Sequence, residues 1–256
     1  MRTLVTGGAG FIGSNLVDEL INQGHQVIVI DNESATENDK FYWNESAENY
    51  KYDICDYEKI EPLFEGVDWV FHLAAQSRIR PAIKNPIRTV RVNCEGTTNI
   101  LQCSRTHGIK KVIYSSTSAC YGLKNESPLN ESMVPDCLNA YSVTKVAAEE
   151  MCKMYTNLHD LPTVTFRYFN VYGERQPTRG QYAPVVGLFI KQKNIGNPMT
   201  VVGDGLQTRD YTHVSDVVRA NIMAAESDLV GNGEIINIGC GENYCVLKLV
   251  EMVVKN

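Results

Sequence analysis

Residues 3–13 read TLVTGGAGFIG, a short apolar run that passes directly into glycines at positions 7, 10 and 13. The first four residues predict a strand, and apolar residues then recur at helical spacing from Ile12 until Gly24. A strand, a glycine turn and a helix in this order can hold a pyrophosphate on backbone N–H groups and a helix N-terminus. The stretch therefore predicts a dinucleotide-binding unit in an α/β fold.

The next strand supports this interpretation. Residues 27–30 are all apolar, and Asp31 ends the run 18 residues after Gly13. A carboxylate at this point can accept hydrogen bonds from both ribose hydroxyls of a dinucleotide, and it would repel a 2′-phosphate. The sequence thus favours NAD over NADP.

Three further apolar runs, residues 69–75, 111–114 and 161–167, predict buried strands of a parallel sheet covered on both faces. Residues 86–106 are expected to form one long helix, and residues 32–50 a loop with one short helix.

Ligands of such a sheet bind beyond the carboxyl ends of its strands. Asp31, Ala74, Ala75 and Thr117 fall at strand ends, as does the glycine turn. The fold class is therefore predicted as α/β, with a doubly wound parallel sheet of Rossmann type and a crevice at these ends.

Composition narrows the range of partners. The net charge of −6 predicts no nucleic-acid partner, and no apolar run approaches the roughly 20 residues that span a bilayer. The eight cysteines show no Cys-x-x-Cys spacing, which indicates a reducing cytoplasm. The histidines have no spacing typical of metal ligands, so no metal site is predicted.

Tyr141 and Lys145 are the candidate catalytic residues, and they lie in the helix-forming run at residues 141–151. Residues four apart share a helix face, so the phenol and the ammonium group should point the same way. A nearby cation favours the phenolate and lowers the tyrosine pKa from its usual value of about 10. Tyr141 could then exchange a proton with a substrate hydroxyl.

Together these motifs resemble the extended short-chain dehydrogenase/reductases, and most of all the sugar-nucleotide 4-epimerases of the UDP-glucose and UDP-N-acetylglucosamine type. The resemblance spans the whole chain. It rests on residues 7–13, Asp31, residues 72–75, Asn93, residues 115–117, Tyr141 with Lys145, residues 167–170, residues 203–205 and residues 209–211.

The resemblance implies a set of site residues. It implies that Tyr141 is the base, that Lys145 holds the nicotinamide ribose and lowers the tyrosine pKa, and that Thr117 binds the reacting hydroxyl. Asn170 and Arg209 would contact the diphosphate of a UDP-sugar, a task that suits a guanidinium. The NAD-binding residues would be Gly7, Gly10, Phe11, Ile12, Gly13, Asp31, Asn32, Asp53, Ile54, Leu73, Ala74, Ala75, Asn93, Ser115, Ser116, Tyr141, Lys145 and Tyr168. His72, by contrast, is expected to be a packed strand residue, and Arg167 and Asn93 could equally be structural hydrogen-bonding residues.

The implied reaction is epimerisation through a transient 4-keto sugar, with NAD retained as a prosthetic group. The related 4,6-dehydratases carry Asp and Glu directly after the threonine, and decarboxylating relatives carry a Glu at the second of these positions. This chain has Ser118 and Ala119, which cannot act as general acids or bases. A 4-keto-sugar reductase or dehydratase, and a catalytically weak NAD- or sugar-nucleotide-binding protein, remain the alternatives.

The predicted domains are an NAD-binding domain at residues 1–169 and a smaller substrate domain at residues 170–256. Relative to the family, the second domain is expected to be incomplete at its C-terminus, so that the chain is either a fragment or naturally short. The resemblance also implies a homodimer formed through helices at about residues 87–106 and 141–157.

Overall fold

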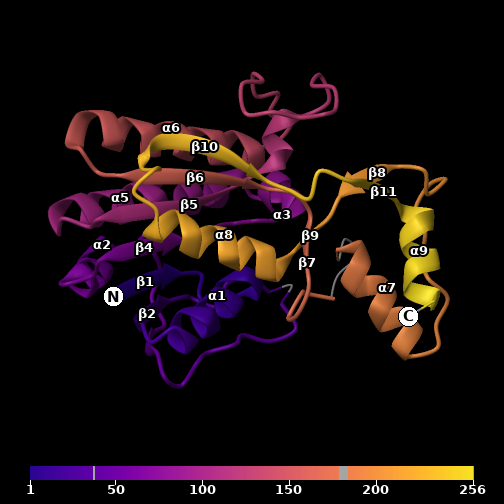
Figure 1. The fold of residues 1–256 in the computed structure, drawn as a ribbon, viewed down its shortest axis with the longest axis horizontal. Helices are drawn as coiled ribbons and strands as arrows, with labels where there is room; N and C mark the ends of the chain where they lie inside the picture. The colour runs from indigo at the N-terminus through magenta and orange to yellow at the C-terminus, as the bar shows by residue number, and fades with distance from the viewer. Residues whose placement is uncertain (37, 179–183, 256) are drawn as a thin grey trace.

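A seven-stranded parallel sheet forms the centre of the computed structural model, which describes residues 1–36, 38–178 and 184–255 (Figure 1). Neighbouring strands pair in parallel throughout this sheet. In spatial order the strands are β10 (Asn232–Ile238), β6 (Thr163–Tyr168), β5 (Lys111–Thr117), β4 (Trp69–His72), β1 (Arg2–Thr6), β2 (Gln26–Ile30) and β3 (Glu48–Tyr50).

The strand order fixes the place of the ligand crevice. From β1 the chain builds outward through β2 and β3, then returns to β4 on the other side of β1 and continues through β5 and β6. The direction of building thus reverses between β1 and β4. In open α/β sheets a crevice opens at this switch point, beyond the carboxyl ends of the strands.

Helices cover both faces of the sheet, which confirms the doubly wound fold (Figure 1). Successive residues of a strand point to opposite faces, so Leu4 packs in one buried cluster with Ile100, and Val5 packs in the other with Leu16. One face carries α2 (Tyr57–Ile60), the 3₁₀ turn η1 (Glu61–Phe64), α5 (Thr97–Thr106) and α6 (Ala140–His159), and the other carries α1 (Phe11–Asn22) and α8 (Val214–Glu226).

Several predicted elements differ from the observed ones. The long helix predicted for residues 86–106 is present with these bounds, and it differs only in a π-helical segment at Arg91–Gly96, between α4 (Pro86–Val90) and α5. The strand predicted for residues 69–75 ends at His72, and β5 continues through the serines to Thr117.

Residues 32–50 contain the edge strand β3 rather than a helix in their described part. Its sequence, Glu48-Asn49-Tyr50, is polar and mostly exposed, so no apolar pattern marks it.

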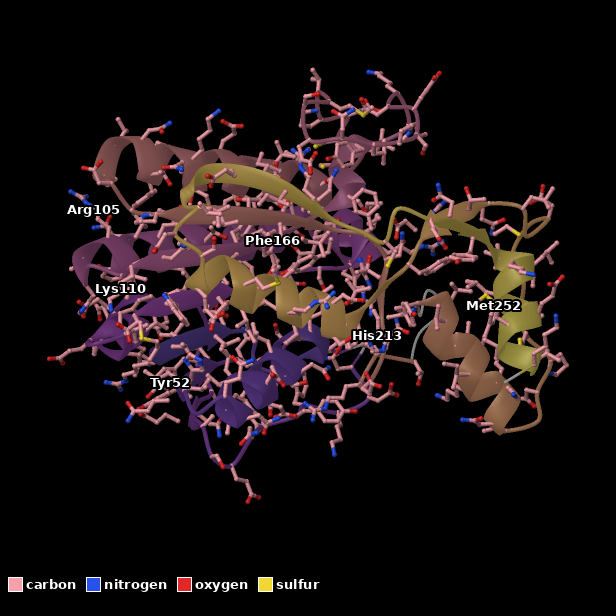
Figure 2. The ribbon with its side chains drawn as sticks, in the orientation of Figure 1. Tyr52, Arg105, Lys110, Phe166, His213 and Met252 are labelled. Atoms are coloured by element: carbon pink, nitrogen blue, oxygen red, sulfur yellow. The ribbon has the colours of Figure 1, made fainter. Side chains whose placement is uncertain are left out.

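A smaller lobe lies beyond the carboxyl edge of the sheet, at the right of Figure 1. Its buried cluster joins Phe189 to Val246 and Leu249. Figure 2 shows Phe166 inside the sheet layer, His213 at the passage between the two parts, and Met252 in the lobe. The lobe and passage are built from β7 (Val171–Tyr172), α7 (Val185–Asn194), β8 (Thr208–Asp210), β9 (Thr212–His213), β11 (Asn243–Cys245) and α9 (Val246–Lys255).

Two elements that follow the predicted boundary at residue 169 pack with the sheet layers. The helix α8 packs against α1, and β10 pairs with β6 from Asn232 to Ile238. Residues 214–238 therefore belong to the layers of the nucleotide-binding part, although they follow the boundary in sequence. The chain leaves the sheet after β6, returns to it through α8 and β10, and leaves again, so a single cut cannot separate the two parts.

Candidate active site

The glycine turn between β1 and α1 is packed so closely that side chains do not fit. Gly7 has a positive φ of +70°, and a Cβ atom there would lie 2.8 Å from the backbone nitrogen of Ala74. A Cβ on Gly13 would lie 2.2 Å from the carbonyl oxygen of Gly7. The first turn of α1 is thereby drawn against the end of β1, where its free backbone N–H groups face the crevice.

Asp31 stands at the end of β2, beside this turn. Its carboxylate accepts hydrogen bonds from the backbone N–H groups of Ala9 (3.2 Å) and Glu33 (2.8 Å). Burial raises the pKa of Asp31, although both hydrogen bonds favour the charged form. The carboxylate is thus held in place by the turn and keeps lone pairs directed at the crevice.

A cavity of about 1630 Å³ runs along the carboxyl ends of the strands and reaches the lobe. It is larger than the roughly 300–1,000 Å³ of a site for one small ligand, so it has room for two. The predicted site residues that line it are Gly7, Gly10, Phe11, Ile12, Gly13, Asp31, Asn32, Ile54, Leu73, Ala74, Ala75, Ser115, Ser116, Thr117, Tyr141, Lys145, Tyr168, Asn170 and Arg209.

Two predicted site residues do not line the cavity. Asp53 lies behind Asn32, whose amide donates to the Asp53 carboxylate over 2.9 Å. Asn93 is 1% exposed, and its amide is bonded to both backbone groups of Gln76 and to the hydroxyl of Thr144. In this structure Asn93 fixes the loop that follows β4, and its contact with a cofactor stays a prediction.

A capping interaction at Asn139 sets the start of α6 and so places the tyrosine. The Asn139 side chain accepts from the backbone N–H of Ser142 over 3.0 Å, and the Ser142 hydroxyl accepts from the Asn139 backbone N–H. The first residues of α6 are thereby fixed at the rim of the cavity. Tyr141 and Lys145, one helical turn apart, both line it.

Lys145 is held by the tip of β5. Its ammonium group donates to the carbonyl oxygen of Ser115 over 2.6 Å and lies 4.7 Å from the centre of the Tyr114 ring. Burial lowers the pKa of Lys145 to about 8, and the nearby carboxylate of Glu149 opposes this shift. The lysine is thus charged at neutral pH and close to its own titration.

The electrostatics of Tyr141 differ from the prediction. Burial raises the pKa of Tyr141, and the groups that oppose this effect are the hydroxyl of Thr117, through a hydrogen bond, and the guanidinium of Arg78. The pKa lowering expected from Lys145 is therefore not what this structure displays. Lys145 directs its ammonium group to Ser115 instead.

Thr117, at the end of β5, accepts a hydrogen bond from the backbone N–H of Ala119 over 3.1 Å. This bond starts the 3₁₀ turn η3 (Ser118–Tyr121) and holds the threonine beside Tyr141. Ser118 and Ala119 also line the cavity. The wall next to Thr117 therefore carries no acidic side chain at either of these positions.

At the lobe end of the cavity, Asn170 donates its amide to the carbonyl of Asp210 over 2.8 Å. The Asp210 carboxylate accepts from the backbone N–H groups of Cys240 and Gly241. These contacts fold the passage between β7 and β8 over the cavity. The Arg209 side chain, which is exposed, bonds the carbonyl of Thr208 and lines the same end.

Sequence reasoning missed the basic residues Arg78 and Arg80, which line the cavity just after β4. It also missed the segment at residues 122–139, of which Leu123, Asn125 and Leu138 contribute to the wall. Two arginines two residues apart after a buried strand could have marked the first group. The second carries no such signal, because the tertiary fold alone brings it to the cavity.

His72 is a packed strand residue, as predicted. It is 1% exposed, and its two ring nitrogens are bonded to the hydroxyls of Thr6 (2.7 Å) and Thr97 (2.9 Å). Burial lowers the pKa of His72 to about 3. The ring is thus neutral, and its role is structural: it links β4 to Thr6 of β1 and to Thr97 of α5.

In residues 1–36, 38–178 and 184–255, no three His, Cys, Asp or Glu side chains gather as a metal would require. Among the helices of the same ranges, none has both the length and the apolar character needed to cross a bilayer.

Residues 3–239 match the sequence profile of the NAD dependent epimerase/dehydratase family. The chain is 37% identical to a UDP-glucose 4-epimerase of Mycolicibacterium smegmatis, over 94% of this chain and 78% of the relative. It is 38% identical to a UDP-N-acetyl-alpha-D-glucosaminuronate decarboxylase of Bacillus cytotoxicus, over 98% of this chain and 78% of the relative. A UDP-glucose 4-epimerase of Thermotoga maritima, solved with UDP-glucose, superposes with a TM-score of 0.93 at 38% identity, over 100% of this chain and 82% of that one.

Proposed function

This chain belongs to the NAD dependent epimerase/dehydratase family, and we propose that it is a sugar-nucleotide 4-epimerase. Its substrates would be UDP-glucose and UDP-galactose or their N-acetyl forms. The observation that carries the proposal is the meeting of Tyr141, Thr117 and Lys145 in one cavity at the switch point of the sheet. A phenol, a hydroxyl and an ammonium group there can act together on a sugar alcohol.

The cavity fits NAD at its sheet end. The glycine turn leaves no room for a Cβ at Gly7 or Gly13, and Asp31 presents a carboxylate beside it. These residues would hold the pyrophosphate and the adenosine ribose, with Ile54 against the adenine and Ala74 and Ala75 along the dinucleotide. Bound NAD supplies a site that accepts a hydride from the sugar and returns it.

The protein's own residues supply the proton chemistry and the geometry. Tyr141 would take the proton of the sugar C4 hydroxyl and later give it back. Thr117, hydrogen-bonded to that phenol, would orient the same hydroxyl. Lys145, fixed on the Ser115 carbonyl, would hold the nicotinamide ribose. Asn170 and Arg209, at the lobe end, would hold the diphosphate of the sugar nucleotide.

The residues after Thr117 favour epimerisation over the other reactions of the family. A dehydratase or a decarboxylase needs a further acid or base beside the sugar. Here Ser118 and Ala119 occupy that wall, and neither ionises. An epimerase needs no such group, because the hydride returns to C4 and the proton returns to the C4 oxygen, so no bond elsewhere in the sugar forms or breaks.

A coupled assay tests the proposal. The purified protein, given UDP-galactose without added NAD, should form UDP-glucose until the two reach equilibrium. If the N-acetyl forms are the substrates, UDP-N-acetylgalactosamine and UDP-N-acetylglucosamine should interconvert in the same way. Stoichiometric consumption of added NADH would indicate a 4-keto-sugar reductase instead. Retained NAD without turnover of any of these sugars would indicate a binding protein.

An exposed apolar surface supports a homodimer as a further part of the proposal. It is formed by Ile83 of α3 (Ile79–Lys84) and Ile87 of α4, neighbouring helices, and these side chains are 63% and 82% exposed. Both α3 and α4 contact α6. Light scattering should show a dimer for the wild-type protein, a monomer for Ile87→Glu, and a dimer for the control Leu229→Glu, which changes an exposed leucine outside this surface.

The state of the cysteines supports a cytoplasmic location. All eight are free thiols, and Cys103, Cys120 and Cys152 are buried. Free thiols persist in a reducing compartment.

A further inference from the structure

A buried ion pair lies directly behind the proposed catalytic residues. The Arg167 guanidinium on β6 donates twice to the Glu149 carboxylate on α6, through Nε (3.0 Å) and Nη2 (2.7 Å). Each residue is 2% exposed. Arg167 also lies 4.9 Å from the centre of the Tyr121 ring. Neither side chain lines the cavity, so neither can touch a substrate.

Stability alone does not account for this pair. Removing two charges from water is costly, and replacing such a pair by apolar groups is often neutral or stabilising. An apolar pair between α6 and β6 would therefore serve the core equally well. The charges need another explanation, and their neighbours offer one.

The pair is connected to Lys145 along two routes. Glu149 follows Lys145 by one turn of α6, and its negative charge favours the lysine ammonium group. Glu149 also accepts a hydrogen bond from the hydroxyl of Ser116. The preceding residue, Ser115, is the one whose carbonyl oxygen holds the Lys145 ammonium group. A single carboxylate thus acts on both the charge and the anchor of the lysine.

The other groups that face Lys145 do not replace this charge. Tyr114 of β5 presents its ring, and its hydroxyl is buried with a pKa well above the usual value. His72 of β4 is neutral, with a pKa of about 3. Burial raises the pKa of the Cys152 thiol on α6 to about 12, and burial also raises that of Tyr141. Of these neighbours, Glu149 is therefore the carboxylate whose charge favours the Lys145 ammonium group.

We propose that Glu149 and Arg167 are positioning residues of the active site, which keep Lys145 protonated and seated on the tip of β5. Glu149 provides the charge, and Arg167 holds the Glu149 carboxylate beside Ser116 through its two hydrogen bonds. Because the benefit of a placed lysine lies in catalysis, the inference rests on the proposed epimerase function, but the titration of Lys145 can be measured without turnover.

The test compares full-length variants by competitive labelling of Lys145 with trace acetic anhydride across pH, read by mass spectrometry. Glu149→Gln removes the carboxylate, so the labelling midpoint of Lys145 should fall by about 1 pH unit or more. Arg167→Lys keeps the charge and should stay close to wild type. Lys111→Met is the matched control: it removes another buried lysine from β5, bonded to the Ala224 carbonyl at the far end of the strand, and should leave the midpoint unchanged.

Should Glu149→Gln fail to fold, the double variant Glu149→Gln/Arg167→Met avoids an unpaired buried guanidinium and should also lower the midpoint, to a smaller extent. A Lys145 midpoint equal to that of wild type in Glu149→Gln, or in the double variant where the single one does not fold, would overturn the proposal. Turnover provides an independent reading, because the alkaline limb of the pH–rate profile should move in parallel with the midpoint. A shifted midpoint in a protein without epimerase activity would refute the proposed function and leave the positioning role standing.

Discussion

Gly13→Ala tests whether the glycine turn is as closely packed as the structure indicates. The new Cβ would lie 2.2 Å from the carbonyl oxygen of Gly7 and 2.8 Å from the Cα of Gly8, both backbone atoms. The contact with the oxygen is more than about 1 Å short of an ordinary van der Waals distance. Neither neighbour can rotate away, so the start of α1 must move away from β1.

The expected magnitude follows from two opposing effects. Overpacking of this kind costs about 3 kcal/mol at the upper end of the usual range. Alanine stabilises a helix interior by about 1 kcal/mol relative to glycine, and this gain offsets part of that cost. The net loss of about 2 kcal/mol corresponds to a fall in melting temperature of about 4–8 °C for a chain of this size. Affinity for NAD should fall as well, because the displaced helix carries the pyrophosphate-binding N–H groups.

Gly187→Ala is the matched control, since Gly187 also lies inside a helix, α7. Its added Cβ would meet the end of the Gln176 side chain at 2.8 Å, and a side chain can turn aside more easily than backbone. Thermal unfolding by circular dichroism and calorimetric titration with NAD provide the two measurements. If Gly13→Ala melts at or above the temperature of Gly187→Ala and binds NAD normally, the close packing inferred for the turn is wrong.

Three further outcomes are expected. Tyr141→Phe should retain NAD and its fold but lose turnover by about 10²–10⁴-fold, as measured by UDP-sugar interconversion, because it lacks the oxygen that carries the proton. Asp31→Asn should reduce the preference for NAD over NADP by about tenfold, measured as a ratio of dissociation constants, since one repulsive charge is removed; an unchanged ratio would assign the selectivity elsewhere. The pKa of His72 is lowered to about 3 in the folded protein, so the unfolded chain binds the extra proton and stability falls with decreasing pH below about 6.5. Between pH 7 and pH 5 the free energy of unfolding, measured with urea, should fall by about 2 kcal/mol more for the wild type than for His72→Gln. An equal fall in both proteins would contradict the buried neutral ring.

The parts of the site that the sequence predicted are those encoded by local spacing. Gly7, Gly13 and Asp31 follow from a strand, a turn and a second strand that are contiguous in the chain, and the structure places all three at the cavity. The tyrosine and the lysine share a helix face for the same reason. Local patterns of this kind leave little freedom to the tertiary fold.

The remaining parts depend on contacts between distant segments. Of the two roles that the sequence left open for Asn93, its hydrogen bonds to Gln76 and Thr144 display the structural one. The helix α8 and strand β10 return to the sheet after the lobe has begun, and no composition change marks their return. Arg78, from the segment after β4, reaches the surroundings of Tyr141 at the start of α6, 63 residues later in the chain. Each of these features depends on which elements pack together, and the packing of distant elements cannot be predicted from local patterns in a single sequence.

The electrostatics of Tyr141 show how such packing changes a chemical prediction. Spacing alone pairs the phenol with the Lys145 ammonium group and suggests a lowered pKa. In the folded protein burial raises it, because a phenolate loses the solvation that water would provide. The ammonium group is meanwhile committed to the Ser115 carbonyl at 2.6 Å. Within the protein, the stabilisation of the phenolate falls to Thr117 and Arg78, so replacing Arg78 by methionine should raise the pH at which turnover reaches half its maximum, whereas a purely packing role for Arg78 would leave that midpoint in place.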